Sequence, residues 1–257
     1  MKKITIILLL LSLVIGAGYG QSPIKRKKSE KTEQGQSGSS SSSQHNTQNN
    51  RNKENKPIVK VSEHDGIING HGYVDLGLPS GTLWATCNLG ANFPQDKGHY
   101  YAWGEIETKS DYNQENYEFN RKLLSDLISK NVIGQNNQLT KSHDVASMRW
   151  GEDWEMPTES DFIELLSCCT WEWFNLKGQS GYLVRGKNNR TIFLPAAESS
   201  RYDTHDCGLY WVTTYHNSKY QLPDVKPLNF GEKYKRISEF GHGQWYGYSI
   251  RPITRKG

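Results

Sequence analysis

The stretch Trp150-Gly-Glu-Asp-Trp-Glu-Met-Pro-Thr-Glu-Ser-Asp-Phe-Ile-Glu-Leu-Leu166 contains a helix start that follows from elementary conformational preferences. Pro157 biases the residue before it, Met156, toward an extended backbone. Thr158 is a favoured N-cap residue, and Asp161 can return a hydrogen bond in a near-capping-box arrangement, with its negative charge at the helix N-terminus. The stretch therefore predicts a helix that begins just after the proline.

An apolar stripe follows this start, because Phe162, Leu165 and Leu166 recur at i, i+3 and i+4. This spacing places the three side chains on one face of a helix, so we expect them to pack into a core. Trp150 and Trp154 lie just upstream, and we expect their bulky rings to cover that core. These residues indicate a fold more than they indicate a chemistry.

Residues 1–20 have the pattern of an export signal. Lys2 and Lys3 precede an apolar run over Ile4–Ile15, and small residues then lead to Gly20. The run is short for a membrane span, so we predict cleavage after Gly20, with a retained membrane anchor as the alternative. No cysteine lies near that point, which disfavours a lipid-anchored form. The protein is therefore expected to be secreted, or held at the cell surface or in the periplasm.

Residues 21–60 are predicted to be a disordered linker. They contain the basic run Lys25-Arg26-Lys27-Lys28, five consecutive serines at 39–43 and an Asn/Gln-rich piece, with little that could form a core. A basic run can bind nucleic acid or an acidic envelope surface. In an exported chain we favour a solvated spacer and expect no nucleic-acid partner.

The charge of the chain divides at the end of this linker. The whole chain has 31 basic and 27 acidic residues, of which residues 1–60 hold 11 and 3. The remaining 20 basic and 24 acidic residues give 61–257 a net charge of −4. The alkaline character therefore belongs to the leader and the linker.

Residues 61–257 are predicted to form one folded domain of the α+β class, because every Trp and Phe lies within them and short apolar runs alternate with turn signals. No later run is apolar enough to span a bilayer. We expect strands at Tyr73–Leu76, Thr82–Asn88, Tyr100–Trp103, Thr170–Phe174, Tyr182–Arg185, Thr191–Leu194, Leu209–Thr213, Lys226–Phe230 and Tyr246–Ile253. We expect helices at Asn116–Lys130, Ser142–Arg149 and Thr158–Cys168.

The four cysteines agree with export to an oxidising compartment. Cys87, Cys168, Cys169 and Cys207 allow three full pairings, and a bridge between the two adjacent residues would be strained. We favour a disulfide between Cys87 and Cys169, with buried thiols as the alternative. No CxxC spacing exists, so a zinc site is disfavoured.

Several segments resemble the Fibrobacter succinogenes major paralogous domain family, in order over residues 72–253. They are Gly72-Tyr-Val-Asp-Leu-Gly-Leu-Pro-Ser-Gly-Thr-Leu-Trp-Ala-Thr-Cys-Asn-Leu-Gly-Ala91, Tyr100-Tyr-Ala-Trp-Gly-Glu105, Trp154-Glu-Met-Pro-Thr158, Cys169-Thr-Trp-Glu-Trp173, Ile192-Phe-Leu-Pro-Ala-Ala197 and Tyr248-Ser-Ile-Arg-Pro252. The resemblance implies a C-type-lectin-like fold with many short antiparallel strands and two or three helices. It also implies binding at or outside the cell surface, and it supplies no reaction.

A more distant resemblance tests the possibility of an enzyme. Met156-Pro-Thr-Glu-Ser-Asp-Phe162 is similar to a segment of formylglycine-generating (sulfatase-modifying) enzymes, whose copper chemistry needs a pair of cysteines near the C-terminus. This chain has no cysteine after Cys207, and its histidines lack the His-x-x-x-His element of related iron-dependent sulfoxide synthases. We therefore expect the scaffold without catalytic residues, metal or cofactor.

Two places carry candidate ligand-binding side chains. Tyr202, Asp203 and His205 gather potential ligands in a polar loop, although their spacing matches no EF-hand or zinc motif. Trp245 and Tyr246 lie in a Gly-rich segment where aromatic rings could stack on sugars, with packing in the core as the alternative.

Packing in the core is also favoured for Trp171 and Trp173, which alternate along one predicted strand.

Taken together, the sequence predicts an exported, non-catalytic module that binds a glycan or a protein, in an oligomeric state that the pattern leaves open. A divergent enzyme of the formylglycine-generating superfamily and a structural envelope or matrix component remain as alternatives.

Overall fold

In the computed structural model, residues 61–198 and 207–256 are described, and they belong to one compact unit. The predicted signal peptide at 1–20 and the predicted linker at 21–60 lie outside the described residues. The described part is a mixed fold of mostly antiparallel strands with three α-helices, which confirms the coarse prediction.

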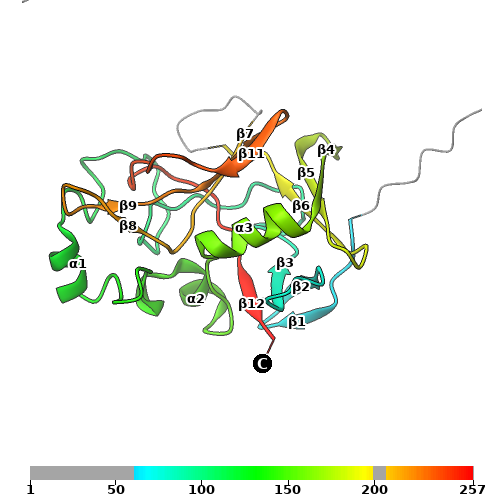
Figure 1. Cartoon of the computed structure of the whole chain (residues 1–257), viewed down its shortest axis with the longest axis horizontal. Helices are drawn as coiled ribbons and strands as arrows, with labels where there is room; N and C mark the ends of the chain where they lie inside the picture. The colour runs from blue at the N-terminus through cyan, green and yellow to red at the C-terminus, as the bar shows by residue number, and fades with distance from the viewer. Residues whose placement is uncertain (1–60, 199–206, 257) are drawn as a thin grey trace, which may run out of the picture. The chain divides into compact units, whose positions relative to one another are not determined.

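A four-stranded antiparallel sheet joins the early and late parts of the domain (Figure 1). Its order is β1 (Gly66–Ile68), β2 (His71–Asp75), β3 (Thr82–Ala85) and β12 (Ile253–Arg255). The red strand β12 therefore lies beside the cyan strand β3, with Ile253 paired to Trp84. This pairing brings the last strand close to the segment 154–156, because Glu155 and Ile253 also form a backbone bridge.

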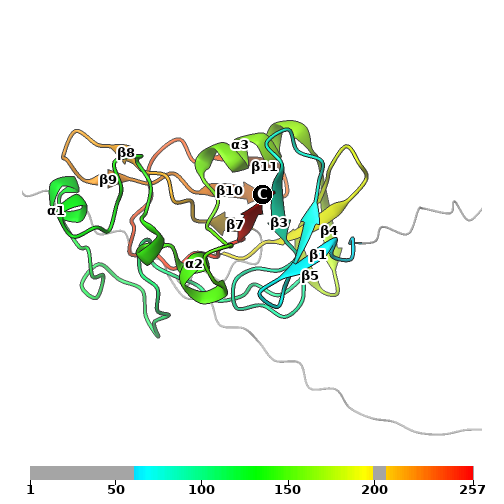
Figure 2. The ribbon, with the colours of Figure 1, turned by 90° about the horizontal axis from the view of Figure 1, so that it is seen from below.

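Two three-stranded antiparallel sheets and a strand pair complete the β structure. One sheet contains β4 (Thr170–Leu176), β5 (Gln179–Arg185) and β6 (Thr191–Pro195) in sequence order. The other has the order β11 (Tyr234–Ile237), β10 (Leu228–Gly231) and β7 (Cys207–Tyr210), and α3 contacts it through β11 (Figure 2). The pair is β8 (His216–Asn217) and β9 (Pro223–Asp224).

The helices are α1 (Leu124–Ser129), α2 (Val145–Trp150) and α3 (Glu159–Cys168), with a short 3-10 turn, η1 (Lys141–His143). The prediction for 158–168 is confirmed: Thr158 is the N-cap of α3, and its side chain accepts from the Asp161 backbone N–H while Asp161 bonds back. The prediction for 142–149 merges η1 and α2, which Asp144 separates as the N-cap of α2. The prediction for 116–130 is wrong in its first half, where Arg121 takes a positive φ of 56° that interrupts a helix.

Several strand predictions differ in extent from the strands observed. The strand predicted at Thr82–Asn88 ends at Ala85, and the one predicted at Leu209–Thr213 overlaps β7 by two residues. The segment Tyr100–Trp103 makes a single backbone bridge, between Tyr101 and Tyr248, and the stretch 246–253 is mostly extended chain that ends in β12. Neither segment lies beside a second strand over its length, so neither builds a ladder.

Strands β1, β8, β9 and β11 were not predicted, although β1 has a sequence signal. Asn69-Gly70 separates β1 from β2, and both residues have positive φ, 49° and 82°. A two-residue Asn-Gly loop is the preferred type I′ turn of a hairpin. Lys177-Gly178 forms the same kind of turn between β4 and β5, with φ of 49° and 94°.

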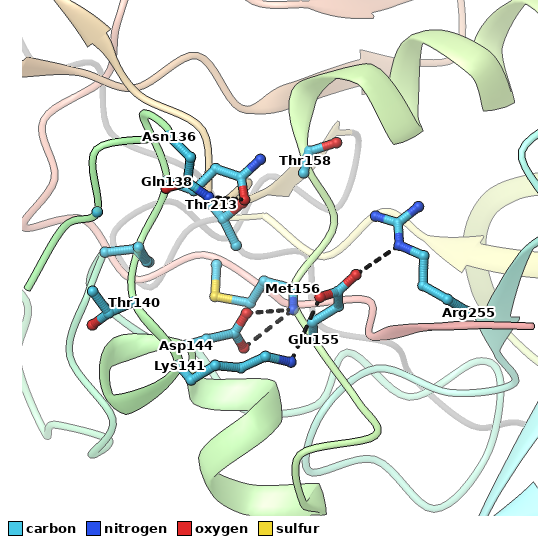
Figure 3. A pocket seen from close by; sticks show the side chains of 12 residues that line it. Asn136, Gln138, Thr140, Lys141, Asp144, Glu155, Met156, Thr158, Thr213 and Arg255 are labelled. Atoms are coloured by element: carbon cyan, nitrogen blue, oxygen red, sulfur yellow. Dashed lines mark hydrogen bonds and ion pairs between the residues drawn. The ribbon is translucent and has the colours of Figure 1, made fainter. Parts of the chain in front are cut away.

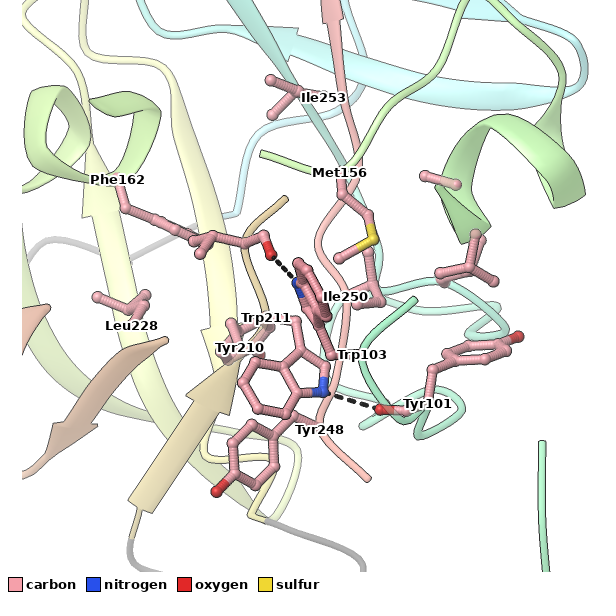
Figure 4. Packing of buried hydrophobic residues seen from close by; sticks show 14 of the residues in the cluster. Tyr101, Trp103, Met156, Phe162, Tyr210, Trp211, Leu228, Tyr248, Ile250 and Ile253 are labelled. Carbon is pink, nitrogen blue, oxygen red and sulfur yellow. Dashed lines mark hydrogen bonds between the residues drawn. The ribbon is translucent and has the colours of Figure 1, made fainter. Parts of the chain in front are cut away.

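The core is built around four fully buried indoles: Trp84, Trp103, Trp154 and Trp211. Three of them donate to main-chain carbonyls. The Trp154 Nε1 donates to Ile68 at 3.1 Å, the Trp103 Nε1 to Val212 at 2.9 Å, and the Trp211 Nε1 to Tyr101 at 2.9 Å; Figure 4 shows the last two. Indoles are seldom buried without a partner for this N–H. The rings therefore fix how the 101–103 and 211–212 segments lie against each other.

The predicted contacts of the 150–166 stretch with the core are confirmed. Phe162 and Leu165 of α3 are fully buried, and Leu166 is partly buried against the core. Trp150 and Trp154 are both buried, with ring centroids 5.1 Å apart in an edge-to-face arrangement.

Trp171 and Trp173 also pack against the core, rather than forming an exposed binding surface. Both rings lie on the inner face of β4, at 5.4 and 5.0 Å from the ring of Tyr182 and at 6.4 Å from that of Phe230. The prediction that they pack with the core is therefore confirmed.

The capping interaction of α3 gives a direct test of the organising stretch. Thr158→Ala removes the oxygen that satisfies a helix N-terminal N–H, so we expect the free energy of unfolding to fall by about 1–2 kcal/mol. Urea unfolding of the full chain measures it. Ser160→Ala, at an exposed position of the same helix, is the control. Equal effects of the two substitutions would contradict the role of the cap.

Candidate functional site

A cavity of about 420 Å³ opens beside the N-terminus of α3 (Figure 3). We name it the Gln138 cavity. Its polar walls come from Asn136, Gln138, Lys141, Asp144, Glu155 and Arg255, which belong to distant parts of the sequence. Its volume lies in the range of small-ligand pockets.

The first wall is a small loop held by backbone hydrogen bonds. Ile133 and Leu139 form an antiparallel bridge, and the Gly134 N–H donates to the Gln138 carbonyl at 2.8 Å. Leu139 N–H donates to the carbonyl of Thr213 at 3.2 Å, which attaches the loop to the chain that continues from β7. The position of Gln138 is therefore set by pairing with residues about 75 positions away.

Asp144 forms the floor of the cavity and is almost completely buried. Its Oδ1 accepts from the backbone N–H groups of Ala146 and Ser147 at 2.9 and 3.0 Å, and its Oδ2 accepts from Met156 at 2.9 Å. Burial raises the pKa of Asp144 to about 6, although the N–H donors of Ser147 and Met156 act in the opposite direction. The carboxyl group therefore joins the start of α2 to the 154–156 segment.

The charged groups at the rim are paired with one another. The Arg255 Nε donates to Glu155 Oε1 at 2.8 Å, and Lys141 Nζ lies 3.7 Å from Glu155 Oε2. Arg255 also makes a two-pronged contact with Asp161, at 2.9 and 3.1 Å. These pairs leave little net charge in the cavity.

Two amide groups retain free hydrogen-bonding capacity. Asn136 Nδ2 donates to Gln138 Oε1 at 3.1 Å. Asn136 Oδ1 and Gln138 Nε2 have no hydrogen-bond partner among the described residues, so one acceptor and one donor stay available side by side. Met156 and Leu139 supply an apolar surface in the same cavity.

The predicted ligand-binding residues are not brought to this cavity. Trp245 and Tyr246 are half-buried with ring centroids 5.5 Å apart, and Tyr246 stacks on Tyr248 at 6.0 Å. Both rings are partly buried against the core, and Trp245 also lines a small pocket beside Gln244, so their ligand-binding role stays a prediction. Tyr202, Asp203 and His205 lie outside the described residues, so their role stays a prediction. Sequence reasoning missed the Gln138 cavity, since its amides carry no motif.

The cysteines form no disulfide in the structure. Cys87, Cys168 and Cys169 are partly exposed thiols, and burial raises the pKa of Cys169 to about 11, with contributions from Cys168 and Glu164. A thiol with a raised pKa is a poor nucleophile at neutral pH. The pairing of Cys87 with Cys169 stays a prediction, which non-reducing peptide mapping of the exported protein can check.

No three His, Cys, Asp or Glu side chains gather as metal ligands in 61–198 and 207–256. Within the same described ranges, no helix has the length and apolar character needed to cross a bilayer.

Comparison of the chain with protein-family models, with characterised proteins and with solved structures found no match. The resemblance to the paralogous-domain family and to the C-type-lectin-like fold therefore stays a prediction.

Proposed function

We propose that the domain is a non-catalytic binding module whose Gln138 cavity takes a neutral, hydroxyl-rich ligand, such as the exposed end of a glycan, at or outside the cell surface. The observation that carries the proposal is the pair of amide atoms without a protein partner, Asn136 Oδ1 and Gln138 Nε2, in a cavity whose charges are already paired. A sugar hydroxyl both donates and accepts, so it can use both groups at once. The location rests on the export signal expected at 1–20.

The state of the carboxyl groups favours binding over catalysis. Both oxygens of Asp144 accept from backbone N–H groups, and Glu155 bridges Lys141 and Arg255. A general acid or base needs an oxygen free to reach the substrate. Binding through neutral amides requires no change in these pairs, so the cavity is preorganised for recognition.

A hydrolytic enzyme is the second candidate, and Asp144 is the observation that favours it. A carboxyl group with a pKa of about 6 in a cavity is a frequent property of acid–base catalysts. Its bonds to Ala146 and Ser147 are those of the α2 cap, and its bond to Met156 holds the neighbouring segment. Burial in this structural role raises the pKa, so we give the raised value a structural origin. Turnover of a bound glycan that is lost in Asp144→Asn would instead support the enzyme.

Binding of the full chain to a glycan array, followed by calorimetry with the best neutral oligosaccharide, tests the proposal. We expect Gln138→Ala to weaken binding by about fivefold, because one hydrogen bond to a ligand is worth roughly 1 kcal/mol. Gln135→Ala is the matched control, since Gln135 is an exposed residue of the same loop outside the cavity.

Three results would count against the proposal: no neutral glycan bound, equal losses in the two variants, or a protein ligand unaffected by Gln138→Ala. Self-association at high concentration without any ligand would favour the structural envelope or matrix role instead. Sedimentation of the full chain distinguishes this outcome.

A further inference from the structure

A second cleft, of about 410 Å³, lies between β2, the end of α2 and the loops around residues 90, 99 and 107. We name it the His71 cleft. The side chains that matter for its chemistry are His71, His99, Tyr101, Glu107, Arg149 and Trp150. None of them lines the Gln138 cavity, so the two sites share no residue.

Its inner wall is aromatic and fixed in place. The ring of His71 stacks on that of Trp150 with centroids 3.8 Å apart and an interplanar angle of 8°. Burial lowers the pKa of His71, so the ring is neutral near pH 7, with one nitrogen that donates and one that accepts. Neither nitrogen has a hydrogen-bond partner among the described residues. A held ring with free nitrogens can bind a hydroxyl group beside it.

The cleft is also lined by a second imidazole ring and a phenol. His99 Nδ1 lies 3.5 Å from the Tyr101 hydroxyl, a distance at the limit of a hydrogen bond. Gly90 has a φ of +80°, and a Cβ there would lie 2.5 Å from the His99 ring. Glycine at this position therefore allows the imidazole to lie directly against the main chain.

Two charged side chains line the cleft: Arg149, which is hydrogen-bonded to the main chain, and its ion-pair partner Glu107, which is mostly exposed. Arg149 Nε and Nη2 both donate to the Ile106 carbonyl, at 3.0 and 2.7 Å. Its ion-pair partner Glu107 is 74% exposed, whereas Arg149 Nη1 has no partner among the described residues. An exposed ion pair contributes little to stability, so Glu107 can leave at low cost while the guanidinium stays in place.

We propose that the His71 cleft binds a carboxylate-bearing sugar, such as a uronic acid unit of an acidic polysaccharide, whose carboxylate replaces Glu107 on Arg149. Guanidinium groups recognise carboxylates through paired N–H donors, and Arg149 offers Nη1 and the Nη2 proton that Glu107 now takes, while its other donors hold it on Ile106. His71, His99 and Tyr101 then face the sugar hydroxyls. Because the folded part has a net charge of −4, recognition depends on this local pairing rather than on long-range attraction.

Calorimetry of the full chain with a galacturonate trimer and with the matching neutral galactose trimer tests the proposal. In the Gln138→Ala background, which removes the other proposed sugar site, we expect the acidic trimer to bind and the neutral trimer not to bind. Arg149→Gln should weaken it by about tenfold or more, since a charge-assisted hydrogen bond is lost. Glu107→Gln should strengthen binding by about threefold, because it removes the internal competitor of the ligand.

Two control variants test whether the effect belongs to the His71 cleft. Arg236→Gln disrupts another exposed Arg–Glu pair, with Glu239, and should leave binding unchanged. Gln138→Ala should also leave it unchanged, so failure of the Gln138 cavity as a site does not affect this result. Circular dichroism of the Arg149→Gln variant is the control that it is folded.

Four outcomes would overturn the proposal. They are no binding of the acidic trimer, equal binding of the neutral trimer in the Gln138→Ala background, weaker binding in Glu107→Gln, and tighter binding of a peptide with a free C-terminal carboxylate than of the sugar. The last result would assign the cleft to protein termini, and the amidated peptide is its control.

Discussion

Arg251→Met is expected to lower the free energy of unfolding by about 3–5 kcal/mol, far more than a surface substitution does. Arg251 is fully buried, and its guanidinium donates to four oxygen atoms. The acceptors are Asn88 Oδ1 at 2.8 Å, Phe193 O at 2.8 Å, Ala85 O at 3.1 Å and Thr86 O at 3.3 Å.

The reason for so large an effect is that the guanidinium joins the end of β3 to β6. Burial lowers the pKa of Arg251, and the hydrogen bonds offset the desolvation of the cation. Methionine fills part of the volume and leaves four oxygens without a donor, each of which costs free energy in a dry interior. Lysine cannot reach the acceptors in two strands at once, so Arg251→Lys should recover only part of the stability.

Urea unfolding of the full chain, followed by tryptophan fluorescence, measures this effect. Arg236→Met is the control, since Arg236 is 58% exposed in a surface pair with Glu239, and we expect it to change stability by less than about 0.5 kcal/mol. A loss below about 1 kcal/mol in Arg251→Met would show that the interior relaxes around the missing donors.

Asp144→Asn is expected to remove a pH dependence that amounts to about 3 kcal/mol in the wild type. The folded-state pKa of Asp144 is about 6, against 3.8 in the unfolded chain, a difference of about two units. The group is protonated in the folded state and ionised in the unfolded state between these values. Its contribution to stability is therefore fully present below about pH 4 and is lost as the pH rises through 6.

Asparagine is a close replacement, because its Oδ1 can still accept from Ala146, Ser147 and Met156. The measurement is the difference in unfolding free energy between wild type and Asp144→Asn, at steps between about pH 4 and pH 7.5. Taking the difference cancels the titration of the other carboxyl groups. We expect the unfolding free energy of the wild type to rise relative to that of the variant as the pH falls. A relative rise with increasing pH would mean that the three N–H donors lower the pKa of Asp144 by more than burial raises it.

Local patterns were sufficient for the elements whose stability is local. Pro157 and Thr158 define the start of α3, and a capping box needs only residues within one turn. The prediction of a helix over 116–130 was wrong in its first half. The composition there allows a helix, but Arg121 adopts a positive φ, which composition does not reveal. The Asn69-Gly70 turn carried a local signal that predicts a hairpin, so β1 was predictable in principle.

Both proposed sites show the opposite situation. The Gln138 cavity joins a loop near 136 to Glu155, Thr213 and Arg255, and the His71 cleft joins β2 to the end of α2. Neither set has a spacing in the sequence that a motif could capture.

By itself, the sequence determined the α+β class, the capped helix at 158–168, the burial of its apolar stripe and the face on which Trp171 and Trp173 pack. These features depend on conformational preferences and periodicity within a few residues. Only the tertiary structure decided which polar side chains meet one another, which have no protein partner and which are hydrogen-bonded to the main chain. The physical reason is that a pairing such as Gln138 with Thr214, or β12 with β3, brings together residues far apart in the chain, and only the packed core selects it.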